Sequence, residues 1–229
     1  PPLIHLYTRI MATRSARVPK TRESENPADP LHYVKRLESR NTGNISLVVI
    51  HCTELPDLAM ARVYGEREHH PETQTGNSGH FYIDRDGSIE QWVPLERIAH
   101  HVRGFNPQSI GIELVNTGRY PDWFNAAHQQ MSEPYPGLQI KALTALIKQF
   151  QHQLPGLERI AGHEDLDTGL VPSQDDPLTM IRRKVDPGPL FPWTQLMTEI
   201  TLQRVTENDR ENKENLCLLR LQPGEESGL

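Results

Sequence analysis

Cysteine and long apolar runs are both scarce in this chain. Only Cys52 and Cys217 occur among 229 residues, which excludes a disulfide-stapled scaffold and a four-cysteine zinc site, and nothing favours a single bridge between the two. No apolar run approaches the roughly 18 residues of a transmembrane helix, and residues 1–10 are poorly arranged for a signal peptide. We expect no transmembrane segment. The visible sequence predicts a cytoplasmic protein, or one of the cell envelope or the secreted space if a signal peptide has been removed.

Positive charge is also in short supply. Lys and Arg total 24 against 30 Asp and Glu, which gives a formal net charge of −6. This balance argues against a nucleic-acid binder held mainly by phosphate contacts, although a local basic patch can still bind an anionic ligand. The length of 229 residues predicts one domain with arms, or a tight two-domain protein. The 15 glycines and 19 prolines favour fixed turns and long loops over a bundle of long helices.

Apolar patterning predicts a mixed sheet with helices packed on it, which is an α/β architecture. Asp57 is a candidate N-cap, and the pair Asp86-Gly87 supplies the positive φ angles of a tight hairpin turn. The predicted helices span residues 29–40, 58–66, 137–153 and 193–205. The predicted strands span residues 45–50, 109–115 and 157–162, with a hairpin over residues 80–93. Residues 164–183 look like a long polar insertion, and the final LCLLRLQ segment is either a strand or a helix.

Two of the predicted strands end in a histidine. His51 and His163 would emerge at the rim of the sheet, where a packed strand fixes the backbone of a ligand. Asp186 lies in a turn stiffened by Pro187 and Pro189, and two imidazoles with one carboxylate suit a catalytic zinc site that keeps its fourth position for water. Spacing alone favours a simpler interpretation, in which each histidine is hydrogen-bonded at a strand edge, because no local metal motif such as HExxH is present.

Five separated segments resemble one known family, in one order along the chain. The segments are VVIHCT (48–53), SGHFYIDRDGSIEQWVP (78–94), AHHVRGFNPQSIGIELV (99–115), AGHEDLD (161–167) and KVDPGP (184–189). They are similar to the zinc-dependent N-acetylmuramoyl-L-alanine amidases of type 2, a family that includes AmpD-type muropeptide amidases, phage lysozyme-type amidases and peptidoglycan recognition proteins. The resemblance covers roughly residues 45–196 and implies a single domain with a central mixed β-sheet flanked by helices.

The same resemblance sets the expected domain boundaries. We expect the amidase domain over residues 44–199. An N-terminal arm with a short helix would precede it over residues 1–43, and a polar C-terminal tail would follow over residues 200–229.

Carried over position by position, the resemblance implies one zinc ion per chain, held by His51, His163 and Asp186. It also implies two catalytic side chains. Glu113, in the SIGIE strand, would take a proton from the attacking water and pass it to the leaving amine. Lys184, two residues before the aspartate, would face the developing oxyanion. The inferred cut is between the lactyl group of N-acetylmuramic acid and the L-alanine of the stem peptide.

The loop after the hairpin holds the candidate substrate-binding residues. His101 precedes a Gly-aromatic-Asn run and is similar to a substrate-contacting position of the family, and Asn106 closes that run. Arg103 is a candidate for holding the carboxylates of a stem peptide. The expected partner is therefore peptidoglycan or a muropeptide, with no nucleic acid, and the oligomeric state stays open.

Two departures from the family pattern and two alternative functions accompany this hypothesis. Gly79 stands where phage lysozyme-type members often carry a tyrosine, which favours the route through Glu113, and the stretch between His163 and Asp186 is longer than the family usually has. One alternative is a non-catalytic peptidoglycan-binding module on the same fold. Members that only bind usually lack the third ligand, whereas Asp186, Lys184 and Glu113 are all present here. The other alternative keeps the zinc ion but hydrolyses a different amide.

Overall fold

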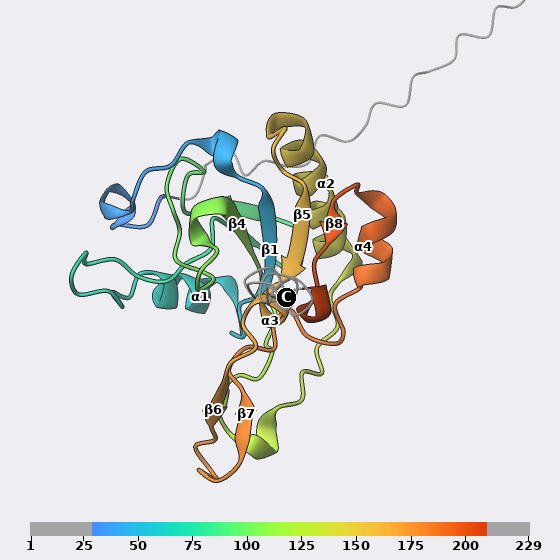
Figure 1. The fold of residues 1–229 in the computed structure, drawn as a ribbon. Helices are drawn as coiled ribbons and strands as arrows, with labels where there is room; N and C mark the ends of the chain where they lie inside the picture. The colour runs from blue at the N-terminus through green and yellow to red at the C-terminus, as the bar shows by residue number, and fades with distance from the viewer. Residues whose placement is uncertain (1–28, 210–229) are drawn as a thin grey trace, which may run out of the picture.

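One mixed sheet organises the fold, which the computed structural model describes over residues 29–209 (Figure 1). Within these residues the main sheet has six strands in the order β3-β2-β4-β1-β5-β8, and β2–β3 is the one antiparallel pair of that sheet. The strands are β1 (Leu47–Cys52), β2 (Phe81–Ile83), β3 (Ile89–Gln91), β4 (Ser109–Leu114), β5 (Arg159–Gly162) and β8 (Gln203–Arg204). The predicted α/β architecture with a central mixed sheet is confirmed.

The central strand β1 is buried along its whole length. Val48 and Ile50 belong to the main apolar core, whereas Leu47 and Val49 belong to a smaller cluster. Successive side chains of a strand point to opposite faces of the sheet. His51 therefore shares its face with Leu47 and Val49, away from the main core.

Helices α2 and α4 pack on the face of the sheet that carries the main core (Figure 1). Helix α2 (Gly137–Gln153) begins after Pro136, and its apolar stripe buries Leu143, Ile147 and Phe150. Helix α4 (Trp193–Glu199) contributes the fully buried Leu196. The prediction of a helix over residues 137–153 is confirmed at both ends.

Helix α1 (Leu58–Gly65) packs on a second cluster of buried apolar side chains, which includes Tyr33 and Trp92. Its predicted N-cap is confirmed, because Asp57 Oδ1 accepts the backbone N–H of Met60 at 2.7 Å. The hairpin of β2 and β3 is also confirmed, and Gly87 adopts a φ of 86° in its turn.

The predicted helix over residues 29–40 is wrong. The segment has one 3-10 turn, η1 (Val34–Arg36), and is otherwise not helical. Its backbone bonds instead to the loop after β3, since the Leu31 N–H donates to the Trp92 carbonyl and the Arg40 N–H donates to the Glu96 carbonyl. The remaining 3-10 turns are η2 (Thr42–Asn44), η3 (Asn106–Gln108) and η4 (Ala126–His128).

The predicted helix over residues 193–205 is too long. Helix α4 ends at Glu199, Ile200 is extended, and residues 203–204 pair with β5 as strand β8. Part of the expected C-terminal tail thus belongs to the sheet. The division of the chain at residues 43/44 and 199/200 stays a prediction, and the LCLLRLQ segment lies outside the described residues.

The stretch expected as a polar insertion contains ordered elements. Helix α3 (His163–Leu166) comes first, and a separate two-stranded sheet follows, formed by β6 (Leu170–Pro172) and β7 (Met180–Arg182). This hairpin projects away from the main sheet (Figure 1). It returns the chain to the sheet edge just before Asp186. None of the helices between residues 29 and 209 combines the length and the apolar character that crossing a membrane requires.

Candidate metal centre

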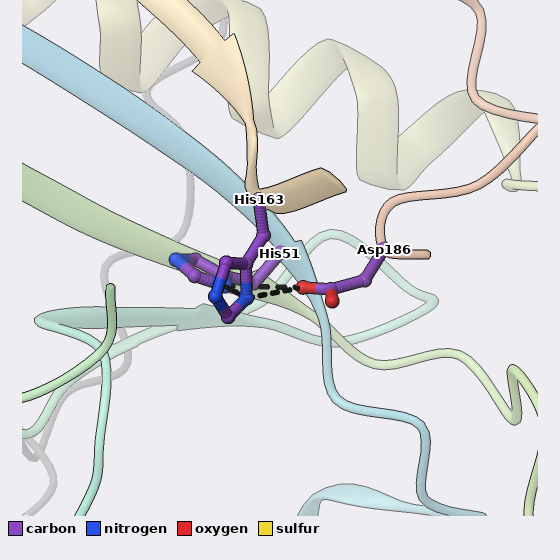
Figure 2. A group of neighbouring side chains, drawn as sticks. All are labelled: His51, His163 and Asp186. Carbon is purple, nitrogen blue, oxygen red and sulfur yellow. Dashed lines mark hydrogen bonds and ion pairs between the residues drawn. The ribbon is translucent and has the colours of Figure 1, made fainter. Parts of the chain in front are cut away.

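Three side chains from three elements meet at one edge of the sheet (Figure 2). His51 comes from the end of β1, His163 from the first residue after the parallel neighbour β5, and Asp186 from the turn that follows the β6–β7 hairpin. His51 Nδ1 lies 3.0 Å from His163 Nδ1, and Asp186 Oδ2 lies 3.1 Å from each of these nitrogens. The structure thus brings together the three side chains that were expected as metal ligands, and we refer to them as the trio.

A chain of hydrogen bonds fixes the proton positions on His51 and His101. The Ser109 hydroxyl donates to the Phe105 carbonyl at 2.8 Å, so its oxygen accepts from His101 Nε2 at 3.1 Å. His101 Nδ1 is then the acceptor for the His51 Nε2–H at 2.9 Å. His51 Nδ1 therefore faces the other two members of the trio with a lone pair, which is the form that a metal ion binds.

Burial and neighbouring charges favour the ligating forms of His51 and Asp186. Burial, followed by the charge of His163, lowers the pKa of His51 to about 4, so this imidazole is neutral at pH 7. Burial alone would raise the pKa of Asp186, but the two imidazoles and Lys184 outweigh it and hold that pKa well below its usual range. Neutral imidazoles and an ionised carboxylate are the states in which these groups bind metals.

The trio fits a zinc ion. Ligands about 2.0–2.1 Å from a tetrahedral zinc lie roughly 3.3–3.4 Å from one another, close to the 3.0–3.1 Å that separates the three donor atoms. Among residues 29–209, no donor lies within hydrogen-bond distance of the other carboxylate oxygen, the buried Asp186 Oδ1, and a cation would stabilise that oxygen. Two nitrogen donors and one carboxylate also match catalytic zinc sites, which keep a fourth position for water.

Glu113 lies beside the trio because β4 pairs with β1 in parallel. Their register sets Glu113 opposite His51, and Glu113 Oε1 lies 3.9 Å from His51 Nδ1. Burial, together with the charge of Asp186, raises the pKa of Glu113 to about 8. A carboxyl group in such surroundings is suited to taking up and returning a proton.

Gly79 leaves the space that Glu113 occupies. A Cβ atom at position 79 would lie 2.8 Å from Glu113 Cγ and 3.1 Å from the Gly111 carbonyl oxygen, and both distances are shorter than van der Waals contact. In this structure a side chain at position 79 and Glu113 exclude each other. Gly79 therefore leaves open the space that the Glu113 side chain fills.

The trio lines the buried side of a cavity of about 930 Å³. Glu113 and Lys184 line the same cavity, as do the cationic side chains of Arg103 and Arg183. Burial, followed by the nearby charge of Arg103, lowers the pKa of Arg183. Arg183 also forms an ion pair with Asp167. Arg103 and Lys184 can attract an anionic group to this part of the cavity, although acidic side chains such as Glu72 and Asp167 also line it.

The three residues expected to bind substrate lie in different environments. Arg103 is exposed and lines the cavity. Asn106 holds its own loop, since its Oδ1 accepts the backbone N–H groups of His101 at 3.1 Å and Val102 at 2.8 Å. Both ring nitrogens of His101 are engaged by His51 and Ser109. His101 therefore holds the ring of His51, and its role toward substrate stays a prediction.

Sequence reasoning missed Ser109 and the pair formed by Glu54 and Arg119. Ser109 stands in the SIGIE segment, four positions before Glu113, so its alternation onto the same face of β4 was a usable signal. Glu54 and Arg119 are 65 positions apart, buried, and joined by a short ion pair of 2.7 Å. Nothing local in the sequence signals that contact.

Comparisons with known proteins point to one family. A family model described as N-acetylmuramoyl-L-alanine amidase matches residues 41–189. N-acetylmuramoyl-L-alanine amidase AmiD of Escherichia coli (strain K12) is 36% identical over 119 residues, which are 47% of this chain and 36% of that protein. 1,6-anhydro-N-acetylmuramyl-L-alanine amidase AmpD of Enterobacter cloacae is 28% identical over 138 residues, 56% of this chain and 58% of that protein. The chain thus covers less than two thirds of each of these relatives.

Solved structures share the fold. The complex of E. coli AmiD with the substrate anhydro-N-acetylmuramic acid-L-Ala-D-gamma-Glu-L-Lys has a TM-score of 0.52 and 26% identity, and covers 68% of this chain and 57% of that one. A structure of AmpD has a TM-score of 0.54 and 24% identity, and covers 76% of this chain and 94% of that one. The second comparison bears on the fold alone.

Proposed function

Since the chain belongs to the N-acetylmuramoyl-L-alanine amidase family, we propose that it hydrolyses the amide bond between N-acetylmuramic acid and L-alanine in peptidoglycan or muropeptides. The observation that carries the proposal is the convergence of His51, His163 and Asp186 within 3.1 Å of one another on the wall of a cavity. The same cavity wall holds Glu113 and Lys184. We assign the activity to residues 44–199 and expect one zinc ion per chain.

His51, His163 and Asp186 would hold the zinc ion, and Glu113 would carry the proton. When bound there, zinc supplies Lewis acidity toward water and the amide carbonyl. Glu113 takes a proton from the attacking water as the new C–O bond forms at the lactyl carbonyl carbon. It delivers that proton to the alanine nitrogen as the C–N bond breaks. The products are a lactyl carboxylate and the free amino group of the stem peptide.

Lys184 supplies positive charge where negative charge develops. It lines the cavity, and its charge acts on both Glu113 and Asp186. We assign its ammonium group to the oxyanion that forms at the carbonyl oxygen. Loss of such a donor typically lowers the rate by about 10²–10³-fold.

Two cationic side chains of the cavity, Arg103 and Arg183, support a peptide with free carboxylates as the ligand. Arg103 and Arg183 lie close enough for their charges to interact, and arginine binds carboxylates through paired hydrogen bonds. The AmiD complex contains a muramyl tripeptide with such groups. We therefore assign Arg103 to the stem peptide, and we expect His101 and Asn106 to shape the wall that the peptide contacts.

Removal of the metal tests the proposal directly. Treatment with a chelator is expected to abolish the release of stem peptides from cell-wall sacculi, and zinc added back is expected to restore it, because the uncatalysed attack of water on an amide is very slow. Mass spectrometry of the products should find peptides with a free L-alanine amino group and glycans that have lost their peptides.

Three results would contradict the proposal. Full release by protein proven free of zinc would remove the metal from the reaction. Binding to sacculi with no release at any zinc concentration would favour the non-catalytic binding module. Release of a different amine would favour the amidase that acts on another amide.

A Gly79→Ala variant is expected to fold and to lose about 10²-fold in kcat, because the added methyl group would displace Glu113 and misplacement of a catalytic group by about 1 Å can cost that much. Gly137→Ala is the matched control, since a Cβ atom there would meet no atom of residues 29–209 within 4 Å. Circular dichroism and kcat of the two variants provide the measurement. Equal kcat values would show that the Glu113 position is not needed for turnover.

A further inference from the structure

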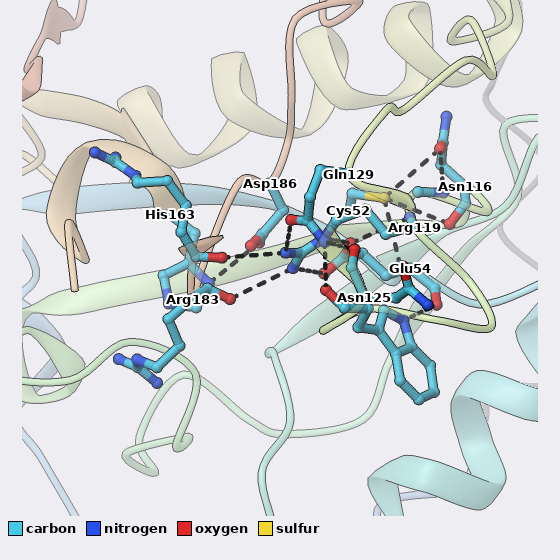
Figure 3. A network of polar contacts seen from close by, with 12 residues as sticks. Cys52, Glu54, Asn116, Arg119, Asn125, Gln129, His163, Arg183 and Asp186 are labelled. Carbon is cyan, nitrogen blue, oxygen red and sulfur yellow. Dashed lines mark hydrogen bonds and ion pairs between the residues drawn. The ribbon is translucent and has the colours of Figure 1, made fainter. Parts of the chain in front are cut away.

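Arg119 is a buried arginine, 1% exposed, whose guanidinium is surrounded by acceptors (Figure 3). Its Nε and Nη2 donate to the two carboxylate oxygens of Glu54 at 2.7 and 2.9 Å. Its Nη1 donates to Gln129 Oε1 at 3.0 Å and to the Arg182 carbonyl at 3.2 Å, and its Nη2 also donates to the Arg183 carbonyl at 3.4 Å. These contacts employ all five N–H groups of a guanidinium.

The groups that this guanidinium contacts on its two sides come from different parts of the metal centre. Glu54 follows β1, the strand of His51, and its backbone is held in the left-handed region with a φ of 51°. The two backbone carbonyls belong to Arg182 and Arg183, which directly precede Lys184 and lie four and three positions before Asp186. Arg119 therefore joins the end of one ligand-bearing strand to the segment that carries another ligand.

The same segment is also joined to the third ligand. The Arg182 side chain donates from Nη2 to the Glu164 carbonyl at 2.7 Å. The Glu164 N–H in turn donates to the Asp186 carbonyl at 2.9 Å. Glu164 is the residue next to His163, so hydrogen bonds and short stretches of backbone link all three proposed ligands. Arg119 lies where this network meets the loop after β1.

Stability alone does not account for this arrangement. A buried ion pair contributes little net stability, because the desolvation of two charges offsets their attraction. The segment that Arg119 contacts, by contrast, returns from a projecting hairpin whose Leu170 and Met180 are more than half exposed. A planar guanidinium can bind one carboxylate and two carbonyls at once, which the compact ammonium of lysine does less well.

We propose that Arg119 is a positioning residue of the metal centre. Its guanidinium, with its charge balanced by Glu54, holds the backbone before Lys184 and Asp186 in register with His51. Arg119 acts through these residues and contacts none of the reacting groups. The proposal rests on the proposed function as far as turnover is concerned.

An Arg119→Lys variant of the full chain tests the proposal. The variant keeps the positive charge but loses the planar, forked set of N–H donors. We therefore expect it to bind zinc about 10–100-fold more weakly, as measured by competition with a chromophoric chelator. We also expect kcat to fall with little change in KM. Arg85→Lys is the matched control, because Arg85 also pairs with a glutamate, Glu133, at 2.6 Å and also holds a backbone carbonyl, that of Pro56, at 2.9 Å. Its zinc affinity should equal that of the wild type.

A folded Arg119→Lys variant with wild-type zinc affinity and kcat would overturn the proposal. If that variant does not fold, the double variant Glu54→Met with Arg119→Met replaces the ion pair by apolar side chains, which buried sites often tolerate. Weak zinc binding by the folded double variant supports the proposal, and wild-type affinity overturns it.

The zinc measurement separates this proposal from the proposed function. A wild-type protein that binds zinc but releases no stem peptide would contradict the function, while the comparison of zinc affinities would still test Arg119. Full release of stem peptides together with unchanged zinc affinity and kcat in Arg119→Lys would uphold the function and remove the positioning role.

Discussion

A Glu113→Gln variant is expected to lose about 10²–10⁴-fold in kcat on muropeptides while keeping its zinc ion. Glutamine has the size of glutamate but cannot take a proton from water and return it to the leaving nitrogen. Glu113 lies on β4 opposite His51, with its Oε1 3.9 Å from His51 Nδ1, and it is not a member of the trio. Zinc content by elemental analysis and binding to sacculi should therefore match the wild type, while single-turnover kinetics reveal the loss.

Glu72→Gln is the control for this experiment, because Glu72 is an exposed carboxylate that lines the same cavity. We expect its kcat to be that of the wild type. Wild-type turnover by Glu113→Gln would exclude Glu113 as the proton carrier and leave the fold and the metal centre as they are.

An Asp186→Asn variant is expected to lose most of the stabilisation that zinc gives the folded protein. A ligand present at 100 times its Kd stabilises the native state by about 2.7 kcal/mol. If the loss of the carboxylate charge weakens zinc binding by about 10²-fold, the same zinc concentration stabilises the variant by only about 0.4 kcal/mol. Thermal unfolding with and without zinc measures the difference, and hydrolysis of muropeptides should fall to background at that zinc concentration.

Asp167→Asn is the control for Asp186→Asn. Asp167 lines the same cavity, but its carboxylate pairs with Arg183 and is not part of the trio. Its melting temperature should rise with zinc as much as that of the wild type. An Asp186→Asn variant with an undiminished zinc response would remove Asp186 from the proposed ligand set.

Local signals in the sequence were sufficient where one short segment determines the structure. Pro136 before an apolar stripe that ends at Pro155 predicted helix α2 at its observed bounds. Asp57 predicted the start of helix α1, and Asp86-Gly87 predicted the hairpin turn. In each case the capping or turn residue lies within a few positions of the backbone group it stabilises.

Prediction failed where tertiary contacts override local pattern. Leu31, Val34 and Leu37 have helical spacing, yet the segment is mostly not helical because its backbone bonds to the loop after β3. The β6–β7 hairpin went unnoticed because each strand has three residues, and Leu170 and Met180 point outward. Strands this short carry too few residues for an alternation to be recognised.

The candidate site also combines residues that could be inferred from the sequence with contacts that could not. The strand-end positions of His51 and His163 could be inferred from apolar runs, and the resemblance supplied the roles expected of Asp186, Glu113 and Lys184. Hydrogen bonds between distant residues could not be inferred. The contact of His101 with His51 and the contact between Glu54 and Arg119 depend on loops that come together only in the folded chain.

The parallel pairing of β1 with its two neighbours fixes the spacing of the side chains at the candidate site. Adjacent strands are spaced about 4.8 Å apart by their backbone hydrogen bonds, so the separation of Glu113 on β4 from His51 on β1 is set mainly by the main chain. A single residue inserted into β1 would turn His51 toward helix α2. Attempts to change the ligand that the cavity accepts should therefore leave these strands alone and vary the surrounding loops.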